Sequence, residues 1–181
     1  MFETGLLTFF GVHLIPFFTG VRNYFLNKFG ENLYKGIFSL LSLTGLFLLI
    51  FGYQSGSTYY YPINGTAYSY SKYIMLISFP LIIAANMQTY MRKVLRHPMS
   101  IGLGIWAIMH LLVNPDFSSI ILFGSFLIYS IVSAFLSELR GSKTSVSNPK
   151  FSLDILSIGI GVFLTLLTFN FHEKLTGVSL T

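Results

Sequence analysis

The chain is poor in charged residues and has no cysteine. Of its 181 residues, 11 are Lys or Arg and six are Asp or Glu, so charged residues make up 9%, against about 25% in a typical soluble domain. With 53% hydrophobic residues, such a chain cannot cover its apolar surface in water. We therefore expect an integral membrane protein whose main partner is the lipid bilayer. The absence of cysteine excludes disulfides, iron–sulfur clusters, thiolate nucleophiles and covalently attached c-type haem.

Six apolar stretches are predicted to cross the bilayer as helices of about 20 residues. They are Phe2 to Phe18, Tyr34 to Tyr53, Tyr73 to Tyr90, Pro98 to Val113, Phe117 to Ser137 and Ser152 to Phe171. The gaps Gly20 to Leu33, Gln54 to Ser71 and Arg92 to His97 are polar, basic or rich in Gly and Ser, which is typical of loops. At the shortest gap, Pro115 stops one helix and Asp116 or Ser118 can cap the next. The predicted fold is all-α, with six transmembrane helices.

The positive charges alternate between the two sides of these helices. Nine of the eleven Lys and Arg fall in the first, third and fifth loops: Arg22, Lys28, Lys35, Arg92, Lys93, Arg96, Arg140, Lys143 and Lys150. The other two, Lys72 and Lys174, fall on the opposite side. Cytoplasmic loops carry the excess of Lys and Arg in membrane proteins, so both termini are predicted to be non-cytoplasmic. The net charge of +5 therefore indicates topology and not nucleic-acid binding.

The four histidines carry most of the chemical information. His13, His97, His110 and His172 lie within or at the ends of the predicted helices, where ionisable groups are costly and usually functional. A neutral imidazole is a common ligand of haem iron and other metals. At about 1.5 Å per residue, His97 and His110 lie roughly 20 Å apart and on different helix faces, so they cannot share one metal ion. Depth allows His13 to pair with His97 or His110, and His110 to pair with His172.

The surroundings of His110 and His13 favour a cofactor site. Trp106 and Asn114 lie four residues before and after His110, which places an aromatic wall and a polar partner on its helix face. His13 follows Phe9 at the same spacing, and a flat ligand can approach it closely. Two mid-membrane imidazoles on different helices, in a chain without cysteine, favour a noncovalent b-type haem over a zinc site.

His97 and His172 are open to plainer interpretations. His97 belongs to Arg96-His97-Pro98 at the cytoplasmic interface, where an imidazole can be solvated or contact a lipid headgroup. His172 continues a row through Gly161 and Thr165, a pattern that is equally typical of close helix packing.

Several motifs over nearly the whole chain resemble the NnrU family. They are Gly11-Val12-His13-Leu14-Ile15-Pro16, Tyr34-Lys35-Gly36-Ile37-Phe38-Ser39, Leu95-Arg96-His97-Pro98-Met99, Trp106-Ala107, His110-Leu111-Leu112 with Asn114 and Asp116, and Leu122-Phe123-Gly124. The resemblance implies a single transmembrane domain over residues 1–181 that binds b-type haem. It relates the chain to plant 15-cis-zeta-carotene isomerase and to bacterial proteins linked with nitric oxide and nitrite metabolism. If the chain is an enzyme, the resemblance implies a haem-dependent cis–trans isomerase of a polyene such as zeta-carotene.

The resemblance also implies a ligand pair and partners. Carried over by motif, the two axial ligands of the haem iron fall on His13 and His110. The partners would be an apolar small molecule or a nitrogen oxide, together with an electron donor. The isomerase exchanges a His for a Cys on reduction, whereas this chain has no Cys, so a ligand exchange here would use another group, with Met109 as a candidate. The short chain without a transit peptide favours the bacterial inner membrane over a plastid membrane.

A second resemblance supports an alternative function. Arg96-His97-Pro98, followed by Gly102 and Asn114-Pro115, is similar to the S-adenosylmethionine-binding segment of isoprenylcysteine carboxyl methyltransferases. In this alternative, Arg96 and His97 bind the cofactor from the cytoplasmic face. Those enzymes carry an acidic pair in a later segment, where this chain has only Glu138. Without that activity, Arg96 and His97 would bind a haem propionate or serve as an orientation signal.

Overall fold

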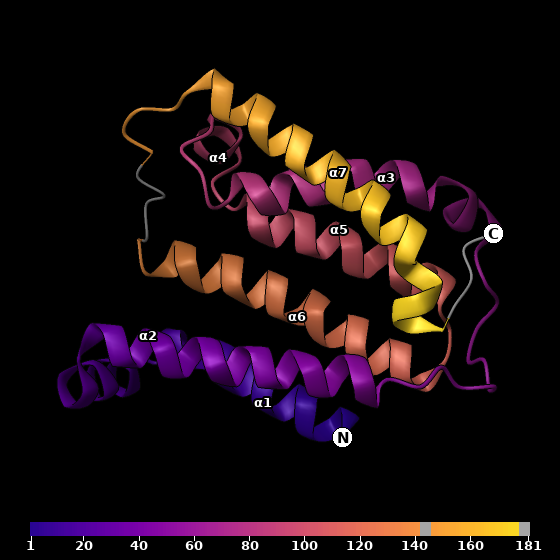
Figure 1. Cartoon of the computed structure of the whole chain (residues 1–181), viewed down its shortest axis with the longest axis horizontal. Helices are drawn as coiled ribbons and strands as arrows, with labels where there is room; N and C mark the ends of the chain where they lie inside the picture. Colours follow the sequence, from indigo (N-terminus) through magenta and orange to yellow (C-terminus); the bar gives the residue numbers. More distant parts are fainter. Residues whose placement is uncertain (142–145, 178–181) are drawn as a thin grey trace. The chain divides into compact units, whose positions relative to one another are not determined.

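The structure, a computed structural model, describes residues 1–141 and 146–177, apart from the side chain of Leu175. Lys143, one of the predicted cytoplasmic cations, lies outside the described residues. Within these ranges the named elements are all helices (Figure 1), and one isolated β-bridge joins Tyr59 to Asp116. The chain forms two compact units, Met1–Gln54 and Ser55–Thr181, which are described separately below.

The first unit is a helical hairpin. Helix α1 (Phe2–Leu14) runs into a 3-10 turn, η1 (Ile15–Phe17), and helix α2 (Thr19–Gly52) returns along it. Two glycines of α2 allow the helices to touch: a Cβ atom at Gly45 would lie 2.7 Å from the backbone N of Phe9, and one at Gly52 would lie 2.5 Å from that of Phe2. Real Cβ atoms do not approach this closely, so glycine is required at both positions.

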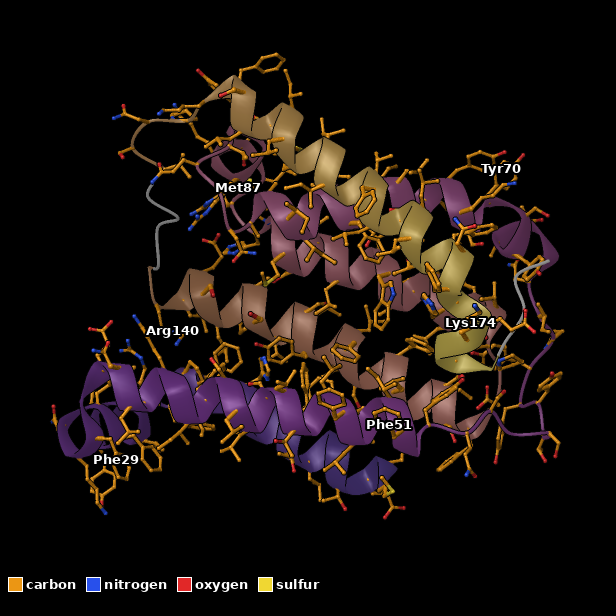
Figure 2. All side chains as sticks on the ribbon, in the orientation of Figure 1. Phe29, Phe51, Tyr70, Met87, Arg140 and Lys174 are labelled. Carbon is orange, nitrogen blue, oxygen red and sulfur yellow. The ribbon has the colours of Figure 1, made fainter. Side chains whose placement is uncertain are left out.

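Helix α2 begins earlier than the sequence predicted. Residues 20–33 were expected to form a loop, but they are helical on both sides of a break at Gly30, whose φ of 75° and ψ of 164° are accessible mainly to glycine. The segment before the break is stabilised by neighbours on one helix face, because Phe25 stacks on Phe29 with ring centroids 6.0 Å apart and Lys28 lies over the Tyr24 ring. Figure 2 marks Phe29 just before the break.

The second unit contains helices α3 (Gly65–Ala84), α4 (Tyr90–Leu95), α5 (Pro98–Val113), α6 (Phe117–Leu139) and α7 (Phe151–Thr176). Helix α3 packs against both α5 and α7, and α5 also packs against α6. The close contacts again use glycine. A Cβ atom at Gly102 would lie 2.7 Å from the carbonyl oxygen of Ser78, and one at Gly161 would overlap the backbone of Pro80. The Gly161 row of α7 is thus a packing surface, as its small residues allowed.

The third predicted span is displaced along the chain. It was expected over 73–90, but α3 begins at Gly65 because the Asn64 side chain caps it, accepting the Ala67 N–H at 2.9 Å. The helix ends at Ala84. The short α4 (Tyr90–Leu95) begins at the last residue of the expected span and continues into the expected 92–97 loop. Its first N–H groups, on Tyr90 and Met91, both donate to the buried carboxylate of Asp154 at 2.9 Å. This long-range cap explains why the sequence did not indicate α4.

The α5–α6 turn forms as predicted. Pro115 follows the end of α5, and Asp116 caps α6 by accepting the Ser119 N–H at 3.1 Å and the Ser119 hydroxyl at 2.6 Å. The preceding loop is bound to this turn, since the Tyr60 N–H donates to the Pro115 carbonyl at 3.0 Å. The turn therefore holds the end of α5 in a fixed position.

Four helices in the described ranges are long and apolar enough to cross a membrane: Thr19–Gly52, Gly65–Ala84, Phe117–Leu139 and Phe151–Lys174. Two further apolar helices, Phe2–Phe17 and Pro98–Val113, are shorter. Apolar side chains cover the outside of these helices, as with Phe51, which is 70% exposed (Figure 2). The all-α prediction is confirmed, and the four helices indicate an integral membrane protein in a lipid bilayer. The count of six spans and the orientation stay predictions.

Candidate functional site

The site is centred on His110, in the last turn of α5. The Nδ1 atom of its ring lies 2.8 Å from the carbonyl oxygen of Trp106. A carbonyl can only accept a hydrogen bond, so Nδ1 carries the proton in the neutral ring and Nε2 carries the lone pair. This arrangement is common in metal-binding histidines, because the bond fixes both the tautomer and the ring orientation.

Aromatic rings surround the His110 imidazole. The Trp106 ring centroid lies 4.7 Å from it, and the Phe123 ring, from α6, lies 4.4 Å away at an interplanar angle of 31°. Phe126 packs edge-on against Trp106 with ring centroids 5.2 Å apart. These rings reduce the polarity around the imidazole, which favours its neutral, ligand-competent form.

A second imidazole lies beside the first. His172, on α7, has its ring centroid 6.5 Å from that of His110, and the two planes differ by 29°. Its Nδ1 atom lies 3.2 Å from the Thr176 hydroxyl, which itself donates to the His172 carbonyl at 2.9 Å. The hydroxyl therefore accepts from Nδ1, and Nε2 carries the lone pair in His172 as well. The open alternative of a His110–His172 pair is compatible with this geometry.

The possible metal ligands here are the two imidazoles. The ring centroids of His110 and His172 lie 6.5 Å apart in a stacked arrangement. In residues 1–141 and 146–177, no three His, Asp or Glu side chains form a metal-binding cluster. The residues present thus fit a haem, which takes one or two protein ligands, better than a zinc ion, which takes three or four.

His13 lies in the first unit with the same local arrangement. Its Nδ1 atom lies 2.7 Å from the Phe9 carbonyl oxygen, so its lone pair is also on Nε2. The ring stacks on Phe9 at 4.2 Å between centroids and meets Phe38 of α2 edge-on at 5.2 Å. Since His13 and His110 belong to different units, their predicted pairing stays a prediction.

Asn114 has a supporting role. Its side-chain amide donates to the His110 carbonyl at 3.1 Å, so it contacts the backbone of His110 and not the ring. The Tyr61 hydroxyl donates to the Leu111 carbonyl. It also lies 3.4 Å from the backbone carbonyl oxygen of Asn114. Burial, followed by the nearby Asp116 carboxylate, raises the pKa of Tyr61, so the hydroxyl keeps its proton and remains a donor. Together these bonds hold the C-terminal turn of α5, and His110 with it.

Arg96 and His97 contact a shared partner away from His110. Both side chains meet Glu138 near the end of α6, with Arg96 Nη2 at 3.0 Å and His97 Nε2 at 2.7 Å from its two carboxylate oxygens. Arg96 has a φ of 59°, which is unusual for a residue with a side chain. These partly exposed contacts link the α4–α5 junction to α6.

Phe123 is the site residue that sequence reasoning missed. It is buried, with 7% exposure, and its ring faces His110. The turn at Asp116 could have indicated this contact, because His110 lies six residues before that position and Phe123 seven residues after it. Residues at similar distances from a tight turn meet when two helices form a hairpin.

The helices and their imidazoles define an all-α membrane protein with histidines arranged as candidate cofactor ligands. A family model described as NnrU protein matches residues 1–180. The chain therefore belongs to the NnrU family, as its motifs predicted. Comparisons with curated proteins and with solved structures give no significant match.

Proposed function

We propose that this chain is a membrane protein that binds b-type haem, with His110 as one axial ligand. The observation that supports this most directly is the bond from His110 Nδ1 to the Trp106 carbonyl, which leaves the lone pair on Nε2 of an imidazole packed against Trp106 and Phe123. Bound haem would supply a redox-active iron for isomerising an apolar cis-alkene or for reacting with a nitrogen oxide. Trp106 and Phe123 would exclude water from the ligand, and Asn114 would keep the end of α5 in place.

The second axial ligand is a histidine in this proposal. The family resemblance implies His13, whose ring is oriented by the Phe9 carbonyl. The local geometry favours His172, whose ring lies 6.5 Å from that of His110. Each choice gives a hexacoordinate iron, and replacement of the two residues one at a time distinguishes them.

Optical spectroscopy tests haem binding. The protein is purified in detergent after expression with a haem supplement, and spectra are recorded in the oxidised and dithionite-reduced forms. We expect a Soret band and a sharp reduced α band, as six-coordinate b-type haem gives. A preparation without a Soret band would contradict the proposal.

The proposed topology has six membrane helices and non-cytoplasmic termini, in a bacterial inner membrane. Phe2–Phe17 and Pro98–Val113 are shorter than the other four apolar helices, and 16 residues span about 24 Å of a hydrocarbon core of roughly 30 Å. Local thinning of the bilayer or flanking residues can cover the difference. The close antiparallel packing of α1 on α2 supports counting the first helix as a span, because it places both helices in the same layer.

The methyltransferase alternative receives less support from the site. Arg96 and His97, its two cofactor-binding residues, both contact Glu138. S-adenosylmethionine would compete with that carboxylate for both side chains. We therefore favour a structural role for this cluster.

A further inference from the structure

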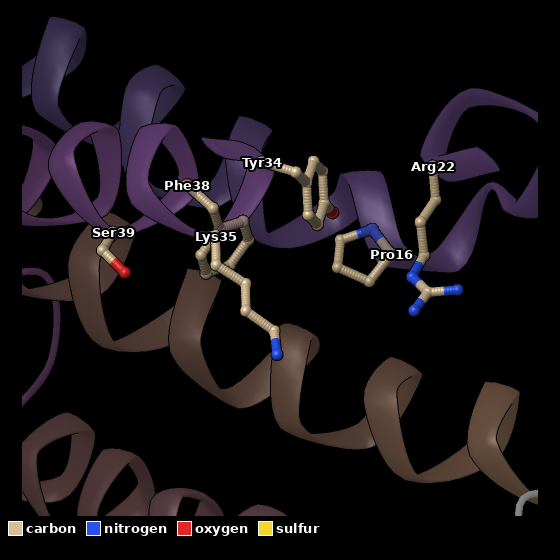
Figure 3. Close-up of a pocket in the computed structure, with 6 residues that line it drawn as sticks. All are labelled: Pro16, Arg22, Tyr34, Lys35, Phe38 and Ser39. Atoms are coloured by element: carbon tan, nitrogen blue, oxygen red, sulfur yellow. The ribbon is translucent and has the colours of Figure 1, made fainter. Parts of the chain in front are cut away.

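The first unit contains a cavity of about 320 Å³ near the turn between α1 and α2. Figure 3 shows the six residues that line it: Pro16, Arg22, Tyr34, Lys35, Phe38 and Ser39. Pro16, Phe38 and the Tyr34 ring form an apolar wall, and two cationic side chains lie along the same opening. The cavity thus combines an apolar surface with positive charge.

The Tyr34 hydroxyl, on a residue that lines this cavity, lacks a hydrogen-bond partner in the described part of the chain. Its oxygen is buried. Figure 3 shows the ring beside Pro16, with the hydroxyl directed toward that side of the cavity. A buried hydroxyl without a partner is unfavourable, so this hydroxyl gains a hydrogen bond if ligand binding brings an acidic oxygen to it.

The charge of the cavity is positive. Lys35 forms an ion pair with Glu31 at 2.6 Å, but both side chains are 68% exposed, so this pair is weak and easily exchanged. Glu31 does not line the cavity, whereas Arg22 and Lys35 do. A guanidinium, an ammonium and a phenolic hydroxyl around one opening can each donate to an acidic group there.

The location favours a ligand that is partly apolar. The cavity lies at the end of the hairpin where the predicted cytoplasmic cations gather, and Phe38 separates it from His13, whose ring centroid lies 5.2 Å from that of Phe38. At the cytoplasmic interface, basic side chains meet anionic headgroups while apolar side chains meet the acyl region.

We propose that this cavity binds the acidic group of an amphiphile, with Arg22 and Lys35 holding the charge, the Tyr34 hydroxyl donating to an acidic oxygen, and Phe38 contacting the apolar body. An anionic phospholipid is the source that the interfacial location favours. The lipid assignment does not depend on haem binding.

Native mass spectrometry of the full-length, haem-free protein in detergent tests the lipid source. Phosphatidylglycerol and phosphatidylcholine with identical acyl chains are titrated separately. We expect the protein to retain phosphatidylglycerol more strongly, and Arg22→Gln to weaken that retention about fivefold. Tyr34→Phe removes only the hydroxyl and should weaken it by a similar factor. This variant keeps the test informative if Arg22→Gln does not fold.

Lys28→Gln is the matched control. Lys28 is a cation of the same basic segment, but its ammonium lies over the rings of Tyr24 and Phe29 and does not line the cavity. Its replacement should leave the preference for phosphatidylglycerol within about twofold. An equal loss with Lys28→Gln and Arg22→Gln would show general surface attraction and overturn the proposal.

If Arg22→Gln and Tyr34→Phe both match the unmodified protein in lipid preference, the proposal is wrong.

Discussion

The imidazole rings of His110 and His172 lie 6.5 Å apart, centroid to centroid, although they belong to α5 and α7. In each ring the Nδ1 atom is hydrogen-bonded to a residue four positions away on the same helix. The partner is the Trp106 carbonyl for His110 and the Thr176 hydroxyl for His172. Both therefore carry the lone pair on Nε2. Two imidazoles oriented in this way, with aromatic rings beside His110, are the basis of the proposed metal centre.

The choice of second ligand gives the first prediction. His13→Ala and His172→Ala are compared in haem-supplemented protein, and one of the two should convert the low-spin spectrum to a high-spin form because it removes an axial ligand. His97→Ala serves as the control, since His97 contacts Glu138 and not the His110 site. Low-spin spectra in both test variants would contradict a bis-histidine iron.

The second prediction concerns the packing of α7 on α3. Gly161→Ala should lower stability by about 1–3 kcal/mol, because the added methyl group overlaps the backbone of Pro80. Gly159 lies on the same helix with nothing within 4 Å of a Cβ atom, so Gly159→Ala should be neutral or stabilise by up to about 1 kcal/mol. Thermal unfolding in detergent measures both, and equal losses would show that the close contact at Gly161 is wrong.

Membrane orientation gives the third prediction. The natural chain has no cysteine, so a single introduced cysteine reports on one position only. Ser57→Cys should react with a membrane-impermeant maleimide on intact cells, because its loop is predicted to be non-cytoplasmic. Gln88→Cys, on the predicted cytoplasmic side, should react only after permeabilisation, and the reverse pattern would contradict the orientation.

The fourth prediction separates the two functional hypotheses. Isothermal titration calorimetry of the purified protein with S-adenosylmethionine should show no binding, because Arg96 and His97 are held by Glu138. Binding that Arg96→Ala weakens would support the methyltransferase alternative instead.

Local sequence patterns predicted the features that depend on neighbouring residues. The cap at Asp116 and the contact of Trp106 with His110 both depend on spacings of three or four residues, and the structure shows them as expected. Asn114 differs from the prediction, because it lies just beyond the end of α5 and bonds to the His110 carbonyl and not to the ring. Composition predicted the apolar helices in the same way. Their ends differ from the prediction at α3, which begins after the Asn64 cap, and at α2, which extends across the break at Gly30.

Contacts between distant helices could not be predicted with the same precision. The sequence allowed His110 to pair with His172 but also allowed two other pairs, because depth in the membrane does not fix which faces meet. The Asp154 cap on α4 joins residues 64 positions apart, and the cavity at Tyr34 depends on how α2 folds back after η1. Such features depend on tertiary packing, for which one sequence gives no spacing rule.

Ligand replacement at His110 tests the central claim most directly. His110→Gly removes the imidazole and leaves a space in which free imidazole can bind, so the purified, haem-supplemented variant is examined with and without it. We predict that the variant loses the low-spin spectrum of the unmodified protein and that added imidazole restores it. A low-spin spectrum that is unchanged in His110→Gly without imidazole would contradict His110 as an axial ligand.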